Sequence, residues 1–149
     1  DMFVTAFKKT GKRAIIQGFQ KTLKNYGLPE TMIACGSVPH SWLFRQGYAV
    51  IHHCGFGTAS AAMIYGIPSI PVPFILDQTG FAMQLEQNNV AVKMIQAKDL
   101  SEERLIEAIN ELDANYVALS QSAKALSEKL QSEHGLETAV ELIEKCLES

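Results

Sequence analysis

The sequence lacks a surplus of basic residues, a long apolar run and any leader pattern. Lysine and arginine number 13 against 16 aspartates and glutamates, which gives a net charge of -3. A chain with this balance has no positive field to attract nucleic acid. No apolar run approaches the ~18 residues of a membrane span, and the first residues show no signal-peptide pattern. We therefore expect neither a nucleic-acid partner nor a transmembrane segment.

The sequence has only three cysteines, and their spacing matches no known pairing motif. Cys35, Cys54 and Cys146 are widely spaced, and the sequence contains no C-x-x-C pair. This spacing suggests neither a structural zinc site nor a disulfide framework. We expect idle thiols in a reducing compartment, which favours a cytoplasmic location.

What the sequence does contain is enough apolar material for one folded domain. The chain has 149 residues, of which 47% are hydrophobic. This length suits a single α/β domain with a real core and is too short for two. Residues Met2–Lys9 have the pattern of a helix end, and domains rarely begin there. We expect residues 1–149 to form one domain that lacks its beginning.

Short apolar segments alternate with helical ones over the first two thirds of the chain. Strands are expected at residues 14–16, 31–35, 48–52, 69–74 and 90–92, helices at 2–9, 57–65 and 79–88, and a helical turn at 41–46. Nearly all the strands are wholly apolar, which is typical of strands buried on both faces. The alternation predicts a doubly wound parallel sheet, an α/β fold.

The last third of the chain is predicted to be helical. Apolar residues recur at spacings of three and four over residues 105–112, 116–130 and 136–147, which predicts three helices. Asp99 and Glu102 match a capping box, with Ser101 as the rival N-cap. Gly135 is predicted to break the second helix.

A glycine-punctuated turn follows the predicted third strand. In doubly wound folds ligands lie at the carboxyl ends of the strands, where His53 and Gly55 fall. The N–H groups and positive dipole of the following helix favour an anion. Gly57 allows close approach, and Thr58 adds a hydroxyl donor. These residues therefore favour a phosphate-binding site at the turn. An ordinary turn between a strand and a helix can share this pattern.

The two adjacent histidines must point to opposite sides of the strand. His53 is nearer the turn, so we expect it to donate to a phosphate oxygen and His52 to pack. Asp77 and Gln78 follow the fourth strand, where a carboxylate and an amide suit vicinal sugar hydroxyls. The alternative role of Asp77 is an ordinary helix N-cap.

A dinucleotide fingerprint is the competing interpretation of this segment. Gly55 and Gly57 nearly complete a G-x-G-x-x-G motif, and Asp77 follows at a suitable distance. Ser60 replaces the third glycine, however, and the paired histidines are foreign to that motif. An NAD-binding domain of an oxidoreductase therefore stays open as an alternative.

Several spaced motifs together resemble one family. These are residues 38–44 (VPHSWLF), 52–58 (HHCGFGT), 66–68 (GIP), 72–74 (VPF) and 77–78 (DQ). In this order they resemble the donor-binding signature of GT-B glycosyltransferases, and are most similar to the sterol glucosyltransferases and the antibiotic and macrolide glycosyltransferases. The resemblance implies the Rossmann-like C-terminal domain of a UDP-glycosyltransferase.

The resemblance also implies roles for individual residues. Its predicted contacts are Ser37, Val38 and His40 with the nucleotide base and ribose; His53, Gly55, Gly57 and Thr58 with the diphosphate; and Asp77 and Gln78 with the sugar. It implies no metal and no cofactor besides the nucleotide sugar, since no D-x-D pair is present. The general base is expected in an N-terminal acceptor domain that this chain lacks, so no catalytic residue is assigned here.

The resemblance implies transfer of a hexose from a UDP-sugar or TDP-sugar to a hydroxyl of a lipophilic or small-molecule acceptor. The fragment alone is expected to bind the donor and to transfer nothing. A peripheral membrane contact is compatible with the full-length protein. The remaining alternative is a non-catalytic partner subunit that lends a donor site to another chain.

Overall fold

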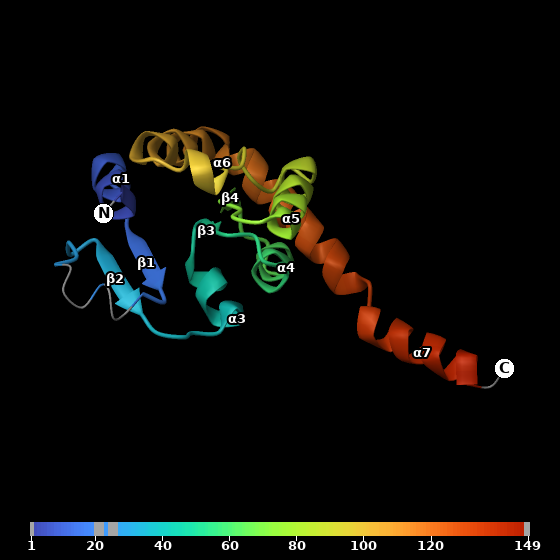
Figure 1. Ribbon diagram of the computed structural model, residues 1–149. Helices are drawn as coiled ribbons and strands as arrows, with labels where there is room; N and C mark the ends of the chain where they lie inside the picture. The colour runs from blue at the N-terminus through green and yellow to red at the C-terminus, as the bar shows by residue number, and fades with distance from the viewer. Residues whose placement is uncertain (1, 20–22, 24–26, 148–149) are drawn as a thin grey trace.

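The structure is a computed structural model that describes residues 2–19, 23 and 27–147. Short parallel strands lie among helices, and two further helices run out toward the carboxyl end (Figure 1). In chain order the elements are α1 (Met2–Thr10), β1 (Ala14–Gln17), β2 (Met32–Cys35), α3 (His40–Leu43), the 3-10 turn η1 (Phe44–Gln46), β3 (Val50–His52), α4 (Phe56–Ile64), β4 (Ser69–Pro71), α5 (Leu76–Gln87), the 3-10 turn η2 (Ala97–Asp99), α6 (Glu102–Ser132) and α7 (Gly135–Leu147).

The α/β class and the parallel strands are confirmed, but the strands form two small sheets. β1 pairs with β2, and β3 pairs with β4, each pair in parallel. The strand predicted at residues 90–92 is a single bridge between Ala91 and Ser69. β4 is shorter than predicted, because Pro71 and Pro73 have no N–H to donate to a ladder.

The two helices predicted at residues 105–112 and 116–130 are one continuous helix, α6, of 31 residues. No glycine or proline separates the two apolar stripes, so nothing ends the helix between them. Ser101 is the N-cap, and its side chain accepts from the Arg104 N–H at 3.2 Å. The predicted capping box is wrong, since Asp99 lies in η2.

The sequence pattern predicted that Gly135 ends the helix, but α6 ends earlier, at Ser132. Gly135 is the first residue of α7, and His134 holds the left-handed conformation, with φ 46°. α7 has no buried residue and extends away from the body of the molecule (Figure 1). Its exposed apolar side chains are Leu136, Val140, Leu142, Ile143 and Leu147. In the described part of the chain, no helix is long and apolar enough to cross a membrane.

α6 is the helix on which α1, α4 and β4 pack. Its first half lies against α1 and β4, and its second half lies against α4. Leu105, Ile109 and Leu112 join Ile70 of β4 and Ala6 of α1 in one buried cluster. The second half supplies Ala123 to a cluster that also contains Cys54, Ala59 and Leu85.

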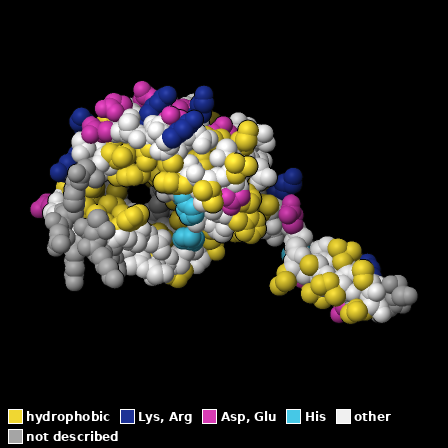
Figure 2. All heavy atoms as spheres, viewed as in Figure 1, with side chains coloured by type: hydrophobic (Ala, Val, Ile, Leu, Met, Phe, Trp, Pro, Cys, Tyr) yellow, Lys and Arg dark blue, Asp and Glu magenta, His cyan; other side chains and the backbone are white. Residues whose placement is uncertain are grey.

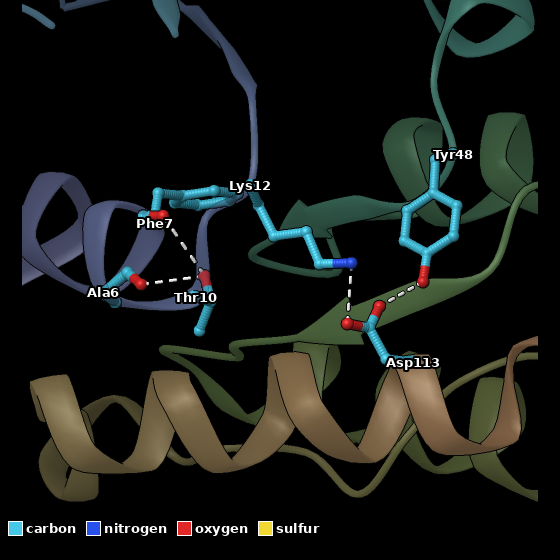
Figure 3. Close-up of polar contacts among 6 residues, drawn as sticks. All are labelled: Ala6, Phe7, Thr10, Lys12, Tyr48 and Asp113. Carbon is cyan, nitrogen blue, oxygen red and sulfur yellow. Dashed lines mark hydrogen bonds and ion pairs between the residues drawn. The ribbon is translucent and has the colours of Figure 1, made fainter.

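A polar cluster ties both sheets to α6. Asp113 of α6 accepts a hydrogen bond from the Tyr48 hydroxyl and pairs with Lys12 at 2.6 Å (Figure 3). The Lys12 ammonium also lies 5.2 Å from the centre of the Tyr48 ring. Lys12 directly precedes the first sheet and Tyr48 the second, so one carboxylate holds the start of both.

We expect Asp113→Ala to lower the free energy of unfolding by about 1–2 kcal/mol, because two polar partners lose their acceptor. Urea unfolding measures this, with Glu107→Ala as the matched control for the exposed Arg104–Glu107 pair. Burial raises the pKa of Asp113, but the hydrogen bonds from Lys12 and Tyr48 outweigh it and lower that pKa below 3.8. The Asp113 contribution is therefore complete above about pH 4 and is lost as pH falls through the lowered pKa. An equal loss of unfolding free energy in Asp113→Ala and Glu107→Ala would contradict a stabilising role for the contacts of Asp113 with Lys12 and Tyr48.

Candidate functional site

β3 delivers its two histidines to opposite environments. His52 is only 8% exposed, whereas His53 is exposed. Successive residues of a strand point to opposite faces, so burial of one ring places the other in solvent. The predicted packing role of His52 is confirmed, and His53 is left available to a ligand.

Two hydrogen bonds hold the His52 ring in place. Its Nδ1 atom accepts from the Cys54 backbone N–H at 3.1 Å, so the ring proton resides on Nε2, which lies 3.2 Å from the Ser69 hydroxyl. Burial, and then the neighbouring His53 and His40, lower the pKa of His52 from 6.5 to about 4. His52 is therefore a neutral structural ring at physiological pH.

The turn after β3 depends on a strained cysteine. Cys54 has a φ of 62°, a conformation that glycine adopts freely and other residues rarely do. Its side chain is fully buried, and burial raises the pKa of the thiol to about 12. Cys54 is consequently no nucleophile. The bond from its N–H to His52 stabilises the left-handed turn that starts α4.

His53 lies directly over the start of α4. A Cβ placed on Gly55 would stand 2.5 Å from His53 Nε2, so only glycine leaves room for the ring in this position. Gly55 is the N-cap of α4, and no side chain caps the helix there. Around Gly57 there is open space within 4 Å of where a Cβ would be. An exposed imidazole, uncapped N–H groups and the positive helix end thus meet at one point.

The predicted base-binding segment lies near this turn. His40 begins α3 and stacks on Phe44, with ring centres 4.7 Å apart. α3 also contacts α4, the helix that follows the His53 turn. Ser37 is exposed, and the Val38 carbonyl accepts from the Gln17 side chain at 2.8 Å. Gln17 thereby fixes the loop that carries Ser37 and Val38, a role that no local pattern of residues indicates.

Asp77 and Gln78 lie in the first turn of α5, which begins three residues before the predicted start at Thr79. The N-cap is Ile75 and no side chain caps the helix, so Asp77 does not serve the alternative role of a cap. The Gln78 Oε1 atom accepts from the Phe74 N–H at 2.9 Å, which leaves its amide N–H groups for a ligand. α5 packs on α4, and this contact brings the two predicted ligand segments to neighbouring helices.

No group of three histidine, cysteine, aspartate or glutamate side chains that could hold a metal occurs among residues 2–19, 23 and 27–147. Ser69, the fully buried partner of His52, is a site residue that the sequence pattern did not predict. The pattern that could have indicated Ser69 is a single hydroxyl residue at the first position of an otherwise apolar strand, β4. The assigned ligand contacts of all nine site residues stay predictions.

Comparison with known proteins places this arrangement in a family. Residues 14–147 match the family model described as the erythromycin biosynthesis protein CIII-like, C-terminal domain. The chain is 38% identical over 116 residues to a sterol 3-beta-glucosyltransferase of Pichia angusta, a match that covers 78% of this chain and 9% of that protein. A sterol 3-beta-glucosyltransferase of Candida albicans is 34% identical over 155 residues, covering 97% of this chain and 10% of the relative. The chain thus spans about a tenth of the length of these relatives.

Solved structures share the fold. The glycosyltransferase VinC in complex with DTDP superposes with a TM-score of 0.84 at 23% identity, over 99% of this chain and 37% of VinC. The glycotransferase of kitacinnamycin gives a TM-score of 0.83 at 23% identity, over 97% of this chain and 38% of that one. The spinosyn rhamnosyltransferase SpnG, complexed with spinosyn aglycone, gives 0.74 at 24% identity, over 88% and 36%.

The buried neutral His52 predicts a loss of stability in mild acid. The pKa of His52 is about 4 in the folded protein, and its ordinary value, taken for the unfolded chain, is 6.5. Between these two pH values the unfolded chain therefore binds more protons than the folded protein does. We expect the free energy of unfolding to fall by roughly 2 kcal/mol between about pH 7.5 and about pH 5. Urea unfolding of His52→Gln should show a flatter pH profile, whereas His53→Gln should keep the steep one. Parallel profiles for the wild type and His52→Gln would contradict this origin.

Proposed function

This chain belongs to the erythromycin biosynthesis protein CIII-like C-terminal domain family of GT-B glycosyltransferases, and we propose that it is the donor-binding half of such an enzyme. The proposed reaction moves a hexose from a UDP-sugar to an acceptor hydroxyl. Because the chain covers 37–38% of these solved neighbours and about a tenth of the curated relatives, the activity of the whole protein belongs to the proposal.

One observation supports the proposal above all others: His53 lies over Gly55 at the uncapped start of α4. A diphosphate seated there would receive N–H groups from the first helical turn, the hydroxyl of Thr58 and the imidazole of His53. Gly57 leaves the backbone accessible. The same geometry in an oxidoreductase would bind a dinucleotide, so the family match decides between the two.

The remaining contacts follow from the neighbouring elements. We assign Asp77 and the amide N–H groups of Gln78 to the sugar hydroxyls, since both lie on α5 beside α4. The exposed Ser37, with Val38 and His40, is assigned to the base and ribose. His40 begins α3, which contacts α4, so this segment lies beside the proposed diphosphate turn.

The proposed mechanism is direct displacement at the anomeric carbon. A general base from the acceptor-binding part of the polypeptide removes the proton of the acceptor hydroxyl. Negative charge then develops on the leaving diphosphate, and His53 with the N-terminus of α4 stabilises it. We propose that no metal is needed for this step.

The location and the acceptor form a separate part of the proposal. The relatives are sterol 3-beta-glucosyltransferases, so we propose a lipophilic acceptor, with peripheral membrane contact by the whole protein. Cys35 and Cys54 are free thiols, which favours a cytoplasmic setting.

Nucleotide selectivity tests the donor assignment. We expect saturation-transfer NMR on the chain to detect weak binding of UDP and TDP through their base and ribose protons. NAD should not displace UDP at equal concentration, because Ser60 and the paired histidines depart from the dinucleotide motif. Displacement of UDP by NAD with equal or better affinity would favour the oxidoreductase alternative.

His53 and Gly55 make a paired prediction. His53→Ala should weaken UDP binding by roughly 1.5–3 kcal/mol, the value of a charge-assisted donor. Gly55→Ala should do the same with His53 intact, because the added Cβ displaces the ring. Calorimetric titration with UDP measures both. His134→Ala, which removes a histidine from the distant α6–α7 junction, is the control and should leave the affinity unchanged; an unchanged affinity in folded His53→Ala would remove His53 from the site.

A further inference from the structure

Ser69 is a hydroxyl residue with a rigid position in the molecule. Its side chain is fully buried, and its backbone pairs with β3, where Val50 lies opposite. On the other side, its N–H donates to the Val90 carbonyl at 3.0 Å, and its carbonyl accepts from the Val92 N–H at 3.1 Å. A backbone paired on both sides leaves the hydroxyl little freedom, so the Ser69 Oγ atom stays at one point.

The Ser69 hydroxyl meets the ring of His52. Val50 lies opposite Ser69 in the parallel ladder, and His52 follows Val50 by two residues, so all three side chains point to one face. The Ser69 Oγ atom lies 3.2 Å from Nε2 of His52. Nδ1 of the same ring accepts from the Cys54 N–H at 3.1 Å, so Nε2 carries the proton and donates a hydrogen bond to Ser69.

Cys54 is the residue at which this chain of contacts ends. Its φ of 62° is a conformation that glycine adopts freely and cysteine adopts at a cost. Its side chain is fully buried in a cluster with Ala59 and Leu85, so glycine at this position would leave that space empty. The bond to His52 therefore holds a cysteine where the backbone alone favours glycine.

We propose that Ser69 is a positioning residue for the donor diphosphate. Through the His52 ring, its hydroxyl holds Cys54 in the left-handed conformation that shapes the ligand turn, residues 53–58. The three residues Ser69, His52 and Cys54 are called the relay below. All three are buried, so they act on the ligand only through the backbone of the turn. This inference rests on the proposed donor site.

The shape of the ligand turn matters because no full positive charge from lysine or arginine lies within it. Residues 46–92 contain neither residue type. Figure 2 shows histidine side chains at the surface of the body beside apolar ones, and no lysine or arginine among the coloured side chains adjoins them in this view. The N–H groups at the start of α4 act over a short range, so a small displacement of the turn lowers the affinity for a diphosphate.

Loss of the Ser69 hydroxyl should loosen the ligand turn. The buried Nε2–H of His52 would then have no acceptor, and the ring would no longer be held against the Cys54 N–H. The turn would spend part of its time with a negative φ at Cys54, and UDP would bind only the remaining fraction. The apparent affinity falls in proportion to that fraction. Glycine at position 54 needs no support at positive φ, so it would make the affinity independent of the relay.

Titration calorimetry with UDP and urea unfolding, applied to the same variants of the chain, test the proposal. We expect Ser69→Ala to weaken UDP binding about 10-fold, the effect of one lost hydrogen bond. Cys54→Gly should bind UDP within about twofold of the wild type. The double variant with both changes should recover the affinity of Cys54→Gly. It should also be the least stable of the three variants, because it lacks both a buried hydrogen bond and a buried side chain. A merely structural role of Ser69 would not give a recovery of affinity together with a loss of stability.

Ser101→Ala is the matched control. It also removes a hydroxyl that accepts from a backbone N–H, that of Arg104 at 3.2 Å, but it does so at the N-cap of α6. Loss of a cap lowers stability. We expect the UDP affinity to stay unchanged, because the partner of Ser101 belongs to the same helix. Ser69→Cys keeps a side chain of similar size and weakens the acceptor, so it should show the changes of Ser69→Ala at smaller size if alanine prevents folding.

NMR of the His52 ring and of the Cys54 amide tests the relay without nucleotide. In the wild type we expect the ring proton on Nε2 and slow hydrogen exchange of the Cys54 amide. In Ser69→Ala this amide should exchange about 10-fold faster, because the ring no longer stays in place. A wild-type ring with its proton on Nδ1 would overturn the proposal, and so would unchanged exchange in Ser69→Ala.

The titrations can overturn the proposal independently. Unchanged UDP affinity in folded Ser69→Ala would do so, and so would a double variant that binds UDP as weakly as Ser69→Ala. Failure of the donor assignment has a different signature. In that case the wild type itself does not bind UDP, while the ring proton and the exchange of the Cys54 amide still report whether Ser69 shapes the turn.

Discussion

The described structure depends on α6, because the two sheets share no backbone ladder with each other. A helix of 31 residues is roughly 46 Å long, and it packs against α1, β4 and α4. Its first half carries Asp113, whose carboxylate holds Lys12 ahead of β1 and Tyr48 ahead of β3. Its second half holds the end of α4, where the Ser127 hydroxyl donates to the Ile64 carbonyl at 2.5 Å. The ligand turn is thus positioned from both ends by one helix.

The shape of the turn between β3 and α4 depends on the buried ring of His52. Ser69 holds His52 on one side, and the Cys54 N–H bonds to it on the other. This second bond fixes the backbone just where Cys54 takes a left-handed conformation, which would otherwise cost about 1–3 kcal/mol. The reversed chain then presents Gly55 and the exposed His53 to solvent. The unreactive histidine therefore shapes the site, and its neighbour is left to meet the ligand.

The sequence was sufficient for elements whose signal is local. Apolar runs identified the strands, and alternation along β3 separated buried His52 from exposed His53. Local patterns failed where the outcome depends on distant partners. No glycine or proline stands between Leu112 and Tyr116, which permits one helix but does not require it; α1 and α4 pack on successive parts of the single helix that forms. The division into two sheets was equally invisible, since periodicity shows that a strand is buried and does not show which edge is paired. Gln17 and Ser69 were missed because their partners lie 21 and 17 residues away.

In a chain of net charge -3, the diphosphate proposed at this turn would be held by the local electrostatics of the turn and not by the overall charge of the protein. Residues 46–92, which include β3, α4, β4 and α5, contain no lysine or arginine. The attraction at the proposed diphosphate site would come from aligned N–H groups, the end of a helix and one imidazole. Such groups act over a short range, and they would stabilise the negative charge that develops on the leaving diphosphate. A fixed lysine or arginine at the same place would instead add a permanent full charge and would hold the product diphosphate more tightly than these dipoles do.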